Sequence, residues 1–324
     1  MKFVAWMAYH LETREIVDDY VRRARKALEG HELVVCEDLE SIKREIADAD
    51  AMIGWRITPE VFAEARKLKW IQFGSAGIDH TLFPELLESD VVLTTLGGIH
   101  TIVVAEHVMA LMLALSRRLD VSMRLQAEHR YERDEIASTA FELSGKTVGI
   151  VGLGRIGLNI ARLAKAFGMR VVGTKRTFVP SLPNVDEVFP AEALGRILPL
   201  SDFLVLVVPL TENTRTLLGR EEIARMKDGA YLVNVARGAM VDHDALGEAL
   251  RSGKLAGAAL DVFPQEPLPE DSPIWSFPNV ILTPHTGGSH PGYSESASEV
   301  FRQNLQAFLS GGEMVNVYRR ERGY

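Results

Sequence analysis

The sequence predicts an α/β fold with two domains, each a doubly wound parallel sheet covered by helices. Its 324 residues suit two domains of roughly 100–200 residues each. Short apolar runs alternate with helical stretches, which is the pattern of parallel sheets. A second alternating series begins after a polar, irregular stretch at residues 129–144, so we expect a second sheet there.

The first series contains predicted strands with helices between them. Apolar runs typical of strands occupy residues 33–35, 51–53, 70–73 and 91–94. Helical patterns occupy residues 12–28, 42–47 and 59–67. Residues 102–119 then form a long and mostly apolar helix, which we expect to be buried between layers.

The second series supplies six more predicted strands and a last helix. The strands are expected at residues 146–151, 170–173, 203–208, 231–235, 256–260 and 280–282, and the last helix at 294–309. The first 98 residues are too few for the first domain, so we expect the last helix to return and complete it. This predicts one domain from residues 1–99 with 289–324, and another from residues 100–288.

Composition excludes several classes of protein. Hydrophobic residues make up 47% and charged residues 25%, a globular balance, and the net charge of −8 offers no basic surface for nucleic acid. Cys36 is the only cysteine, so an internal disulfide and cysteine-based zinc sites are excluded. Residues 1–9 are too short an apolar run for a signal peptide, and Glu106 and His107 interrupt the most apolar helix. We expect a soluble cytoplasmic protein.

A glycine-rich segment follows the predicted strand at 146–151 and opens a predicted helix. The residues are Gly152-Leu153-Gly154-Arg155-Ile156-Gly157, which match the pattern G-x-G-x-x-G. Between a strand and a helix, this pattern is typical of dinucleotide binding, because the glycines let the backbone approach a pyrophosphate at the helix N-terminus. The alternative is a glycine-rich turn that binds nothing.

The end of the next strand favours NADP over NAD. NAD sites usually place an acidic residue about 20 residues after the first glycine, where it accepts from the ribose 2′-hydroxyl. Here the strand leads into Lys175, Arg176 and Thr177, and no Asp or Glu lies between Met169 and Val185. Two cations in this place suit a 2′-phosphate. The alternative is an ordinary solvated turn, with NAD still possible.

Several further segments occur in the order found in one enzyme family. They are Phe73-Gly74-Ser75-Ala76-Gly77-Ile78-Asp79-His80, Val104-Ala105-Glu106-His107, Val208-Pro209-Leu210-Thr211, Asn234-Val235-Ala236-Arg237-Gly238, Asp261-Val262-Phe263-Pro264-Gln265-Glu266-Pro267 and Thr283-Pro284-His285-Thr286-Gly287-Gly288. Over residues 50–310 the chain resembles the D-isomer-specific 2-hydroxyacid dehydrogenases. The resemblance implies a Rossmann cofactor domain and a flavodoxin-like substrate domain, with the active site in the cleft between them.

Arg237, Glu266 and His285 match the family's catalytic residues, and their chemistry suits a 2-keto acid. The planar fork of Arg237 can bind a carboxylate oxygen and the ketone oxygen together. A histidine can supply a proton near neutral pH, so His285 is the expected acid in reduction and base in oxidation. Glu266 would orient His285 and stabilise its charged form. Taken singly, each residue could be an ordinary loop residue.

The resemblance also implies supporting residues. Cofactor contacts are expected from Thr101, Gly152, Gly154, Arg155, Ile156, Gly157, Lys175, Arg176, Thr177, Pro209, Thr214, Ala236, Asp261 and His285. Substrate contacts are expected from Trp55, Ser75, Ala76, Gly77 and Arg237, with the Ala76 and Gly77 N–H groups binding a carboxylate. Thr101 could instead cap a helix, and Trp55 could instead pack within its domain. Departures from the family include Tyr131, where many members have tryptophan.

The predicted reaction is the reversible reduction of a 2-keto acid to the (R)-2-hydroxy acid by NAD(P)H. Glu266 argues against formate dehydrogenase, and the absence of lysine near Ser75 argues against phosphite dehydrogenase. A reductase specific for glyoxylate or hydroxypyruvate, and a corepressor that senses dinucleotide, stay as alternatives. The resemblance implies a homodimer, with residues 101–145 at the interface.

Overall fold

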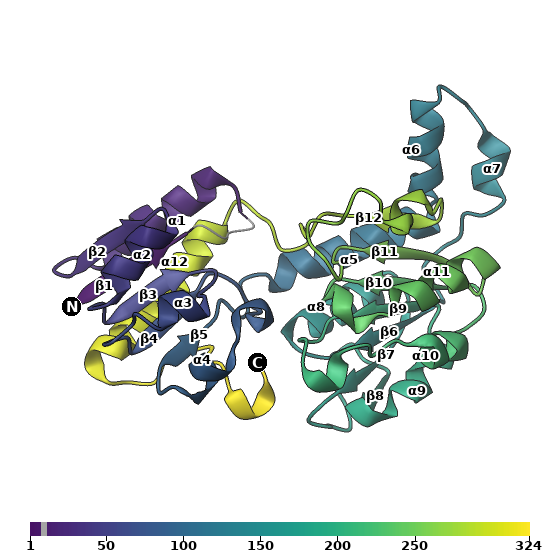
Figure 1. Cartoon of the computed structure of the whole chain (residues 1–324). Coiled ribbons are helices and arrows are strands. Elements are labelled where there is room, and N and C mark those ends of the chain that lie inside the picture. The colour runs from purple at the N-terminus through teal and green to yellow at the C-terminus, as the bar shows by residue number, and fades with distance from the viewer. Residues whose placement is uncertain (8–11) are drawn as a thin grey trace. The chain divides into compact units, whose positions relative to one another are not determined.

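The computed structural model describes residues 1–7 and 12–324 and divides into two compact units (Figure 1). Unit 1 contains Met1–His100 and Ser289–Tyr324, and unit 2 contains Thr101–Gly288. In the described residues no helix has the length and apolarity needed to cross a membrane. No cluster of His, Cys, Asp and Glu among them could hold a metal ion.

Unit 1 is a five-stranded parallel sheet with helices on its faces. Its strands are β1 (Lys2–Trp6), β2 (Glu32–Cys36), β3 (Ala51–Gly54), β4 (Trp70–Phe73) and β5 (Val92–Thr94). Its helices are α1 (Arg14–Ala27), α2 (Leu39–Ile46), α3 (Pro59–Phe62), α4 (Pro84–Glu88) and α12 (Tyr293–Ser310). The strand order β2-β1-β3-β4-β5 is the flavodoxin-like doubly wound order, as predicted.

Helix α12 supplies part of the core of unit 1 although it comes from the far end of the chain. Phe301 stacks on Trp70 of β4, with 5.7 Å between the ring centroids, and neither side chain is exposed. The buried amide of Asn304 donates to the side-chain oxygen of Gln72 at 3.0 Å. The apolar stacking and the satisfied polar pair both tie α12 to β4, because a buried amide without a partner would be costly.

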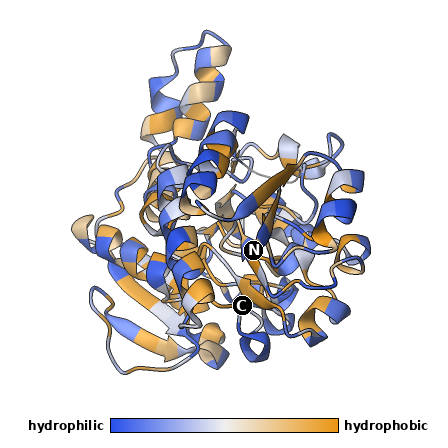
Figure 2. Cartoon of the chain, turned by 90° about the vertical axis from the view of Figure 1, so that its left-hand side faces the viewer, coloured by the Kyte–Doolittle hydropathy of each residue, from blue (hydrophilic) through white to orange (hydrophobic). Residues whose placement is uncertain are grey.

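Unit 2 is a seven-stranded parallel sheet. Its strands are β6 (Thr147–Val151), β7 (Arg170–Lys175), β8 (Glu187–Pro190), β9 (Phe203–Leu206), β10 (Ala230–Asn234), β11 (Leu255–Leu260) and β12 (Val280–Leu282). Its helices are α5 (Thr101–Ser116), α6 (Leu119–Ala127), α7 (Arg133–Ala137), α8 (Arg155–Ala166), α9 (Leu194–Ile197), α10 (Arg220–Arg225) and α11 (His243–Ser252). The strands are largely apolar and buried, as expected for a sheet covered on both faces. The strands that can be seen in Figure 2 are mostly in the hydrophobic colour.

The strand order of unit 2 creates a binding position at one edge of the sheet. The order is β12-β11-β10-β9-β6-β7-β8, so the chain leaves β6 toward β7 and later returns to β9 on the other side. This reversal is the switch point of a Rossmann sheet, where ligands bind beyond the carboxyl ends of the strands. The three predicted catalytic residues and most of the predicted cofactor residues lie at the ends of, or in the loops after, β6, β7, β9, β10, β11 and β12.

Several elements differ from the prediction. Strand β1 was not predicted, although residues 3–6 are four consecutive apolar residues. Strand β8 was also missed, since it is four residues long and ends in proline. The polar stretch 129–144 contains the short helix α7, and α6 with α7 extends away from the rest of unit 2 (Figure 1).

Candidate active site

The glycine-rich turn joins β6 to α8, and its three glycines meet three different demands. Gly152 has a φ of +109°, a conformation that L side chains rarely adopt. A Cβ on Gly157 would collide with the carbonyl oxygen of Gly152, so a side chain there is excluded. A Cβ on Gly154 would meet no atom within 4 Å. Open space at Gly154, before the first turn of α8, is what a pyrophosphate needs to reach the backbone N–H groups.

This difference between the glycines gives a paired prediction. We expect Gly154→Ala to keep the melting temperature of the wild type and to lose cofactor affinity, because its methyl group would fill the space for the phosphates. We expect Gly157→Ala to lower the melting temperature, because its methyl group meets backbone. Thermal unfolding and cofactor titration by fluorescence check both. Full cofactor affinity in Gly154→Ala would contradict the assignment of this turn.

Lys175 and Arg176 lie at the carboxyl end of β7 but have different surroundings. Lys175 is the last residue of β7, and its Nζ donates to the Leu153 carbonyl at 2.8 Å. Lys175 therefore braces the glycine-rich turn, a contact that the sequence did not predict. Arg176 and Thr177 follow the strand and are exposed. Arg176 is therefore the cation better placed to contact a ligand.

Three more predicted cofactor residues, Pro209, Thr214 and Ala236, follow strands at the same edge of the sheet. The Thr214 hydroxyl donates to the Pro209 carbonyl at 2.8 Å, which closes the loop after β9. The Ala236 carbonyl accepts from Nη1 of Arg237 at 2.7 Å. Thr101 is the first residue of α5.

His285 and Glu266 are in direct contact. His285 Nδ1 lies 2.6 Å from Glu266 Oε2, and the Phe263 backbone N–H donates to Glu266 Oε1 at 2.9 Å. Burial raises the pKa of Glu266, but the hydrogen bonds from His285 and Phe263 and the charges of His285 and Arg237 outweigh it, so the pKa is lowered. An ionised Glu266 can only accept, so Nδ1 of His285 must carry hydrogen. This leaves Nε2 as the atom that can exchange a proton with substrate.

The backbone at His285 is held in an unusual conformation. Its φ is +54°, in the left-handed region, which costs a residue with a Cβ on the order of 1–3 kcal/mol. The His285 N–H donates to the carbonyl oxygens of Asp261 at 2.9 Å and Thr283 at 3.0 Å. Surrounding contacts therefore impose the conformation, as is common where a side chain must be aimed at a ligand.

Arg237 follows β10 in a loop whose backbone is held by the side chain of Asn234. The side chain of Asn234, which is fully buried, accepts from the Ala236 N–H and donates to the Arg237 carbonyl, both at 3.0 Å. A Cβ on Gly238 would collide with the backbone of Phe263 and Pro264. Gly238 therefore lets the Arg237 loop lie against the loop that carries Glu266. Sequence reasoning missed Asn234 and Gly238 as positioning residues, although both lie in the quoted motif.

Asp261 is a buried carboxylate that accepts several hydrogen bonds. It is 2% exposed, and its carboxylate accepts from the Thr283 hydroxyl at 2.6 Å, the Thr286 N–H at 2.9 Å and the Gly287 N–H at 3.0 Å. Burial raises the pKa of Asp261, but the hydrogen bonds from His107, Thr283 and Gly287 lower it by more. The net result is a pKa below the usual value for aspartate. Asp261 therefore holds the segment around His285, and its contact with nicotinamide stays a prediction.

The predicted substrate residues of unit 1 follow β3 and β4. The Ser75 hydroxyl donates to the Gly77 carbonyl at 3.0 Å, and Ala76 is exposed. Trp55 is 4% exposed and stacks on Tyr293 with 6.0 Å between ring centroids, which agrees with the packing alternative for this residue. A Cβ on Gly74 would lie 2.5 Å from the Trp55 ring, so Trp55 packs directly against the start of the loop after β4.

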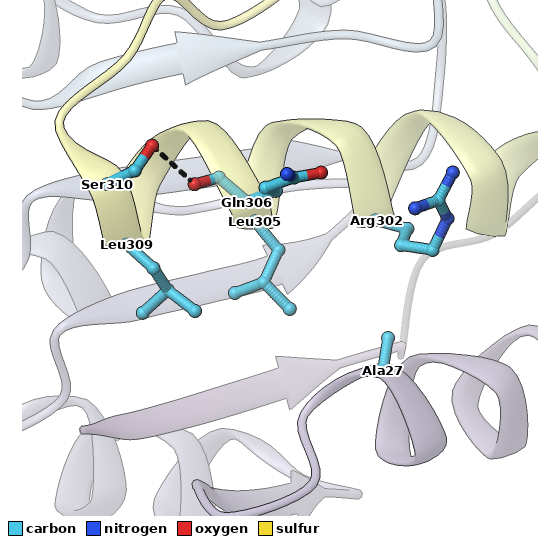
Figure 3. A pocket seen from close by; sticks show the side chains of 6 residues that line it. All are labelled: Ala27, Arg302, Leu305, Gln306, Leu309 and Ser310. Atoms are coloured by element: carbon cyan, nitrogen blue, oxygen red, sulfur yellow. Dashed lines mark hydrogen bonds between the residues drawn. The ribbon is translucent and has the colours of Figure 1, made fainter.

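A shallow hollow of about 370 Å³ elsewhere in unit 1 is a poor candidate for catalysis. It lies between α1 and α12 and is lined by Ala27, Arg302, Leu305, Gln306, Leu309 and Ser310 (Figure 3). Its one cation, Arg302, pairs with Glu299 at 2.6 Å. The hollow contains none of the predicted catalytic or cofactor residues.

Comparison with known proteins agrees with the geometry. Residues 109–287 match the family described as D-isomer specific 2-hydroxyacid dehydrogenase, NAD binding domain. A glyoxylate reductase from Thermococcus onnurineus is 37% identical over 326 residues, which cover 96% of each chain. The chain belongs to the D-isomer-specific 2-hydroxyacid dehydrogenases. It is an oxidoreductase that uses NAD(P) and acts on 2-keto and 2-hydroxy acids.

Two more members of the family show the range of the similarity. A D-3-phosphoglycerate dehydrogenase from Methanocaldococcus jannaschii is 38% identical over 285 residues, and the chain spans about half of that relative, 53%. An NADPH-dependent glyoxylate/hydroxypyruvate reductase from Sinorhizobium meliloti, solved with NADP and sulfate, superposes with a TM-score of 0.85 at 27% identity. That match covers 100% of this 2-hydroxyacid dehydrogenase and 99% of the other chain.

Proposed function

We propose that this dehydrogenase reduces small 2-keto acids with NADPH, and that His285 is the proton donor and Arg237 the carboxylate and ketone ligand. The contact of 2.6 Å between His285 Nδ1 and Glu266 Oε2 carries this proposal, because it leaves Nε2 of His285 as the proton-exchanging atom. A bound dihydronicotinamide supplies the hydride. His285 gives a proton to the ketone oxygen as the C–H bond forms, and takes it back in oxidation.

Arg237 and the loop after β4 are proposed to hold the substrate. The guanidinium of Arg237 would contact one carboxylate oxygen and the ketone oxygen, and would stabilise the negative charge that develops on the latter. The N–H groups of Ala76 and Gly77 have no partner among the described residues and are proposed to bind the carboxylate. Initial rates over a panel of 2-keto acids, with glyoxylate and hydroxypyruvate included, test the substrate class.

The proposed preference for NADPH rests on Arg176, which would bind the 2′-phosphate. Lys175 is proposed to support the glycine-rich turn through its bond to Leu153. We expect Arg176→Gln to lower kcat/KM for NADPH by about 1–3 kcal/mol, the value of a charge-assisted contact. The value of kcat/KM for NADH should stay nearly unchanged. We expect Lys175→Gln to weaken both cofactors, because its bond to Leu153 supports the shared pyrophosphate turn. Arg162→Gln, an exposed change on α8, serves as control. Equal use of NADH and NADPH by the wild type would contradict this preference.

We also propose a cytoplasmic homodimer that uses the arm formed by α6, α7 and the segments around them. The arm exposes large apolar side chains: Leu119 is 48%, Met123 71% and Tyr131 94% exposed. Exposed apolar side chains that cluster in this way mark protein interfaces. Sedimentation should give twice the mass of one chain, and Met123→Lys should shift the equilibrium toward monomer. A monomeric wild type at micromolar concentration would refute the dimer.

A further inference from the structure

The segment that carries His285 is anchored to α5 through a side-chain contact that no catalytic role explains. His107 of α5 places its Nε2 3.2 Å from Thr283 Oγ1 and 3.5 Å from Asp261 Oδ1. Thr283 Oγ1 lies 2.6 Å from the same Asp261 oxygen. A Cβ on Gly287 would come within 3.0 Å of the His107 ring, so the ring lies directly against this segment.

The donors in this cluster can be assigned from chemistry alone. Asp261 has a lowered pKa, and its ionised carboxylate can only accept. At 2.6 Å the Thr283 hydroxyl must therefore give its single hydrogen to Asp261. The Thr283 oxygen is then left to accept, so Nε2 of His107 must carry hydrogen and donate. Hydrogen bonds run in one direction, from His107 through Thr283 to Asp261.

Asp261, the last acceptor in this series of hydrogen bonds, also binds the backbone of His285 and of the two residues that follow it. Asp261 takes the N–H groups of Thr286 and Gly287, and its own carbonyl takes the N–H of His285. Three successive N–H groups, from His285 to Gly287, are thus bound to one residue. This arrangement imposes the left-handed backbone at His285, and so sets the direction in which its ring points toward Glu266.

We propose that His107 is a positioning residue, which holds Thr283 and Asp261 in place by donating from Nε2 and thereby fixes the segment carrying His285. The proposal rests on the proposed role of His285 as proton donor. It assigns His107 no contact with substrate. Displacement of a catalytic group by about 1 Å can cost 10²-fold in rate, so the expected effect is on turnover.

The test compares variants that remove the donor with variants that keep it. His107→Leu and Thr283→Val should lower kcat on the order of 10-fold to 100-fold, with KM for the keto acid within about threefold of the wild type. His107→Gln and Thr283→Ser keep a donor and a hydroxyl, so each should recover most of the lost turnover. Glu106→Gln, an exposed change on the same helix, should behave as the wild type.

A second measurement reads the segment itself, without turnover. Hydrogen exchange of the peptide spanning residues 283–288, measured by mass spectrometry on the full chain without cofactor, should be faster in His107→Leu and Thr283→Val than in the wild type. Unchanged exchange, or a His107→Gln variant as impaired as His107→Leu, would overturn the proposal. Full turnover in His285→Ala would instead refute the proposed function, so the two failures are distinguishable.

Discussion

His285→Ala should lower kcat for reduction on the order of 10²–10⁴-fold, the contribution of a general acid. Cofactor affinity and melting temperature should stay near those of the wild type, because the glycine-rich turn and the sheet do not depend on the imidazole. Steady-state rates, cofactor titration and thermal unfolding measure these three quantities. If His285→Ala retained full turnover, the proton donor would lie elsewhere.

The dependence on pH separates the role of Glu266 from that of His285. Reduction needs His285 protonated at the start, so its rate should fall as pH rises, and oxidation should rise over the same range. The pKa of Glu266 is lowered, so its carboxylate stays ionised until pH falls through that lowered value, and it favours the imidazolium above it. In Glu266→Gln the falling limb of reduction should therefore move to lower pH.

The control for this profile lies on the same loop. Glu270→Gln removes one negative charge from an exposed position four residues away, and it should leave the limb where the wild type has it. A limb that stays fixed in Glu266→Gln would mean that Glu266 does not act on His285. A limb that moves equally in both variants would point to the general field of the loop.

Arg237→Lys should fail to restore activity and should lower kcat/KM on the order of 10²–10³-fold, the cost of one lost donor to a developing oxyanion. Lysine keeps the charge but lacks the planar fork, so it cannot bind a carboxylate oxygen and the ketone oxygen together while also bonding the Ala236 carbonyl. KM for the keto acid should rise as kcat falls, because the substrate carboxylate is bound before the reaction.

A matched change separates this effect from general instability. Arg170→Lys, at the start of β7, alters an arginine that pairs with Glu187 on the surface and should leave kinetics unchanged. Thermal unfolding of Arg237→Lys should resemble that of the wild type. Turnover in Arg237→Lys close to that of the wild type would refute the role proposed for the guanidinium.

Much of the fold could be predicted because parallel strands that are buried on both faces are continuous apolar runs. Residues 70–73 have the observed bounds of β4, which is buried throughout. Residues 280–282 have the observed bounds of β12, an apolar edge strand that is partly buried. The predicted helix at 59–67 was too long, since α3 ends at Phe62 and the chain turns. Strand β8 was missed because it begins with a charged residue, Glu187, and ends with Pro190, which leaves only two apolar residues between them.

In the candidate site too, features within one short segment could be predicted from the sequence, and contacts between distant segments could not. The glycine-rich turn was predictable, because its G-x-G-x-x-G pattern lies within one strand, one turn and one helix. The bond from Lys175 to Leu153 and the contacts of Asp261 join segments distant in sequence, and no local pattern encodes them. His107 stood in a quoted motif without a role, because only the packing of α5 reveals its neighbour.

The return of α12 to unit 1 has a consequence for the order of events during synthesis. The first 100 residues leave the ribosome long before Phe301 and Asn304, which complete the packing on β4. At 5–20 residues per second, about 190 intervening residues delay that completion by roughly 10–40 s. Unit 2 is continuous in sequence and can fold in that interval, whereas one apolar face of the nascent sheet of unit 1 is covered only by α1 until α12 is made. During this interval the exposed apolar surface of unit 1 can either be bound by chaperones or lead to aggregation.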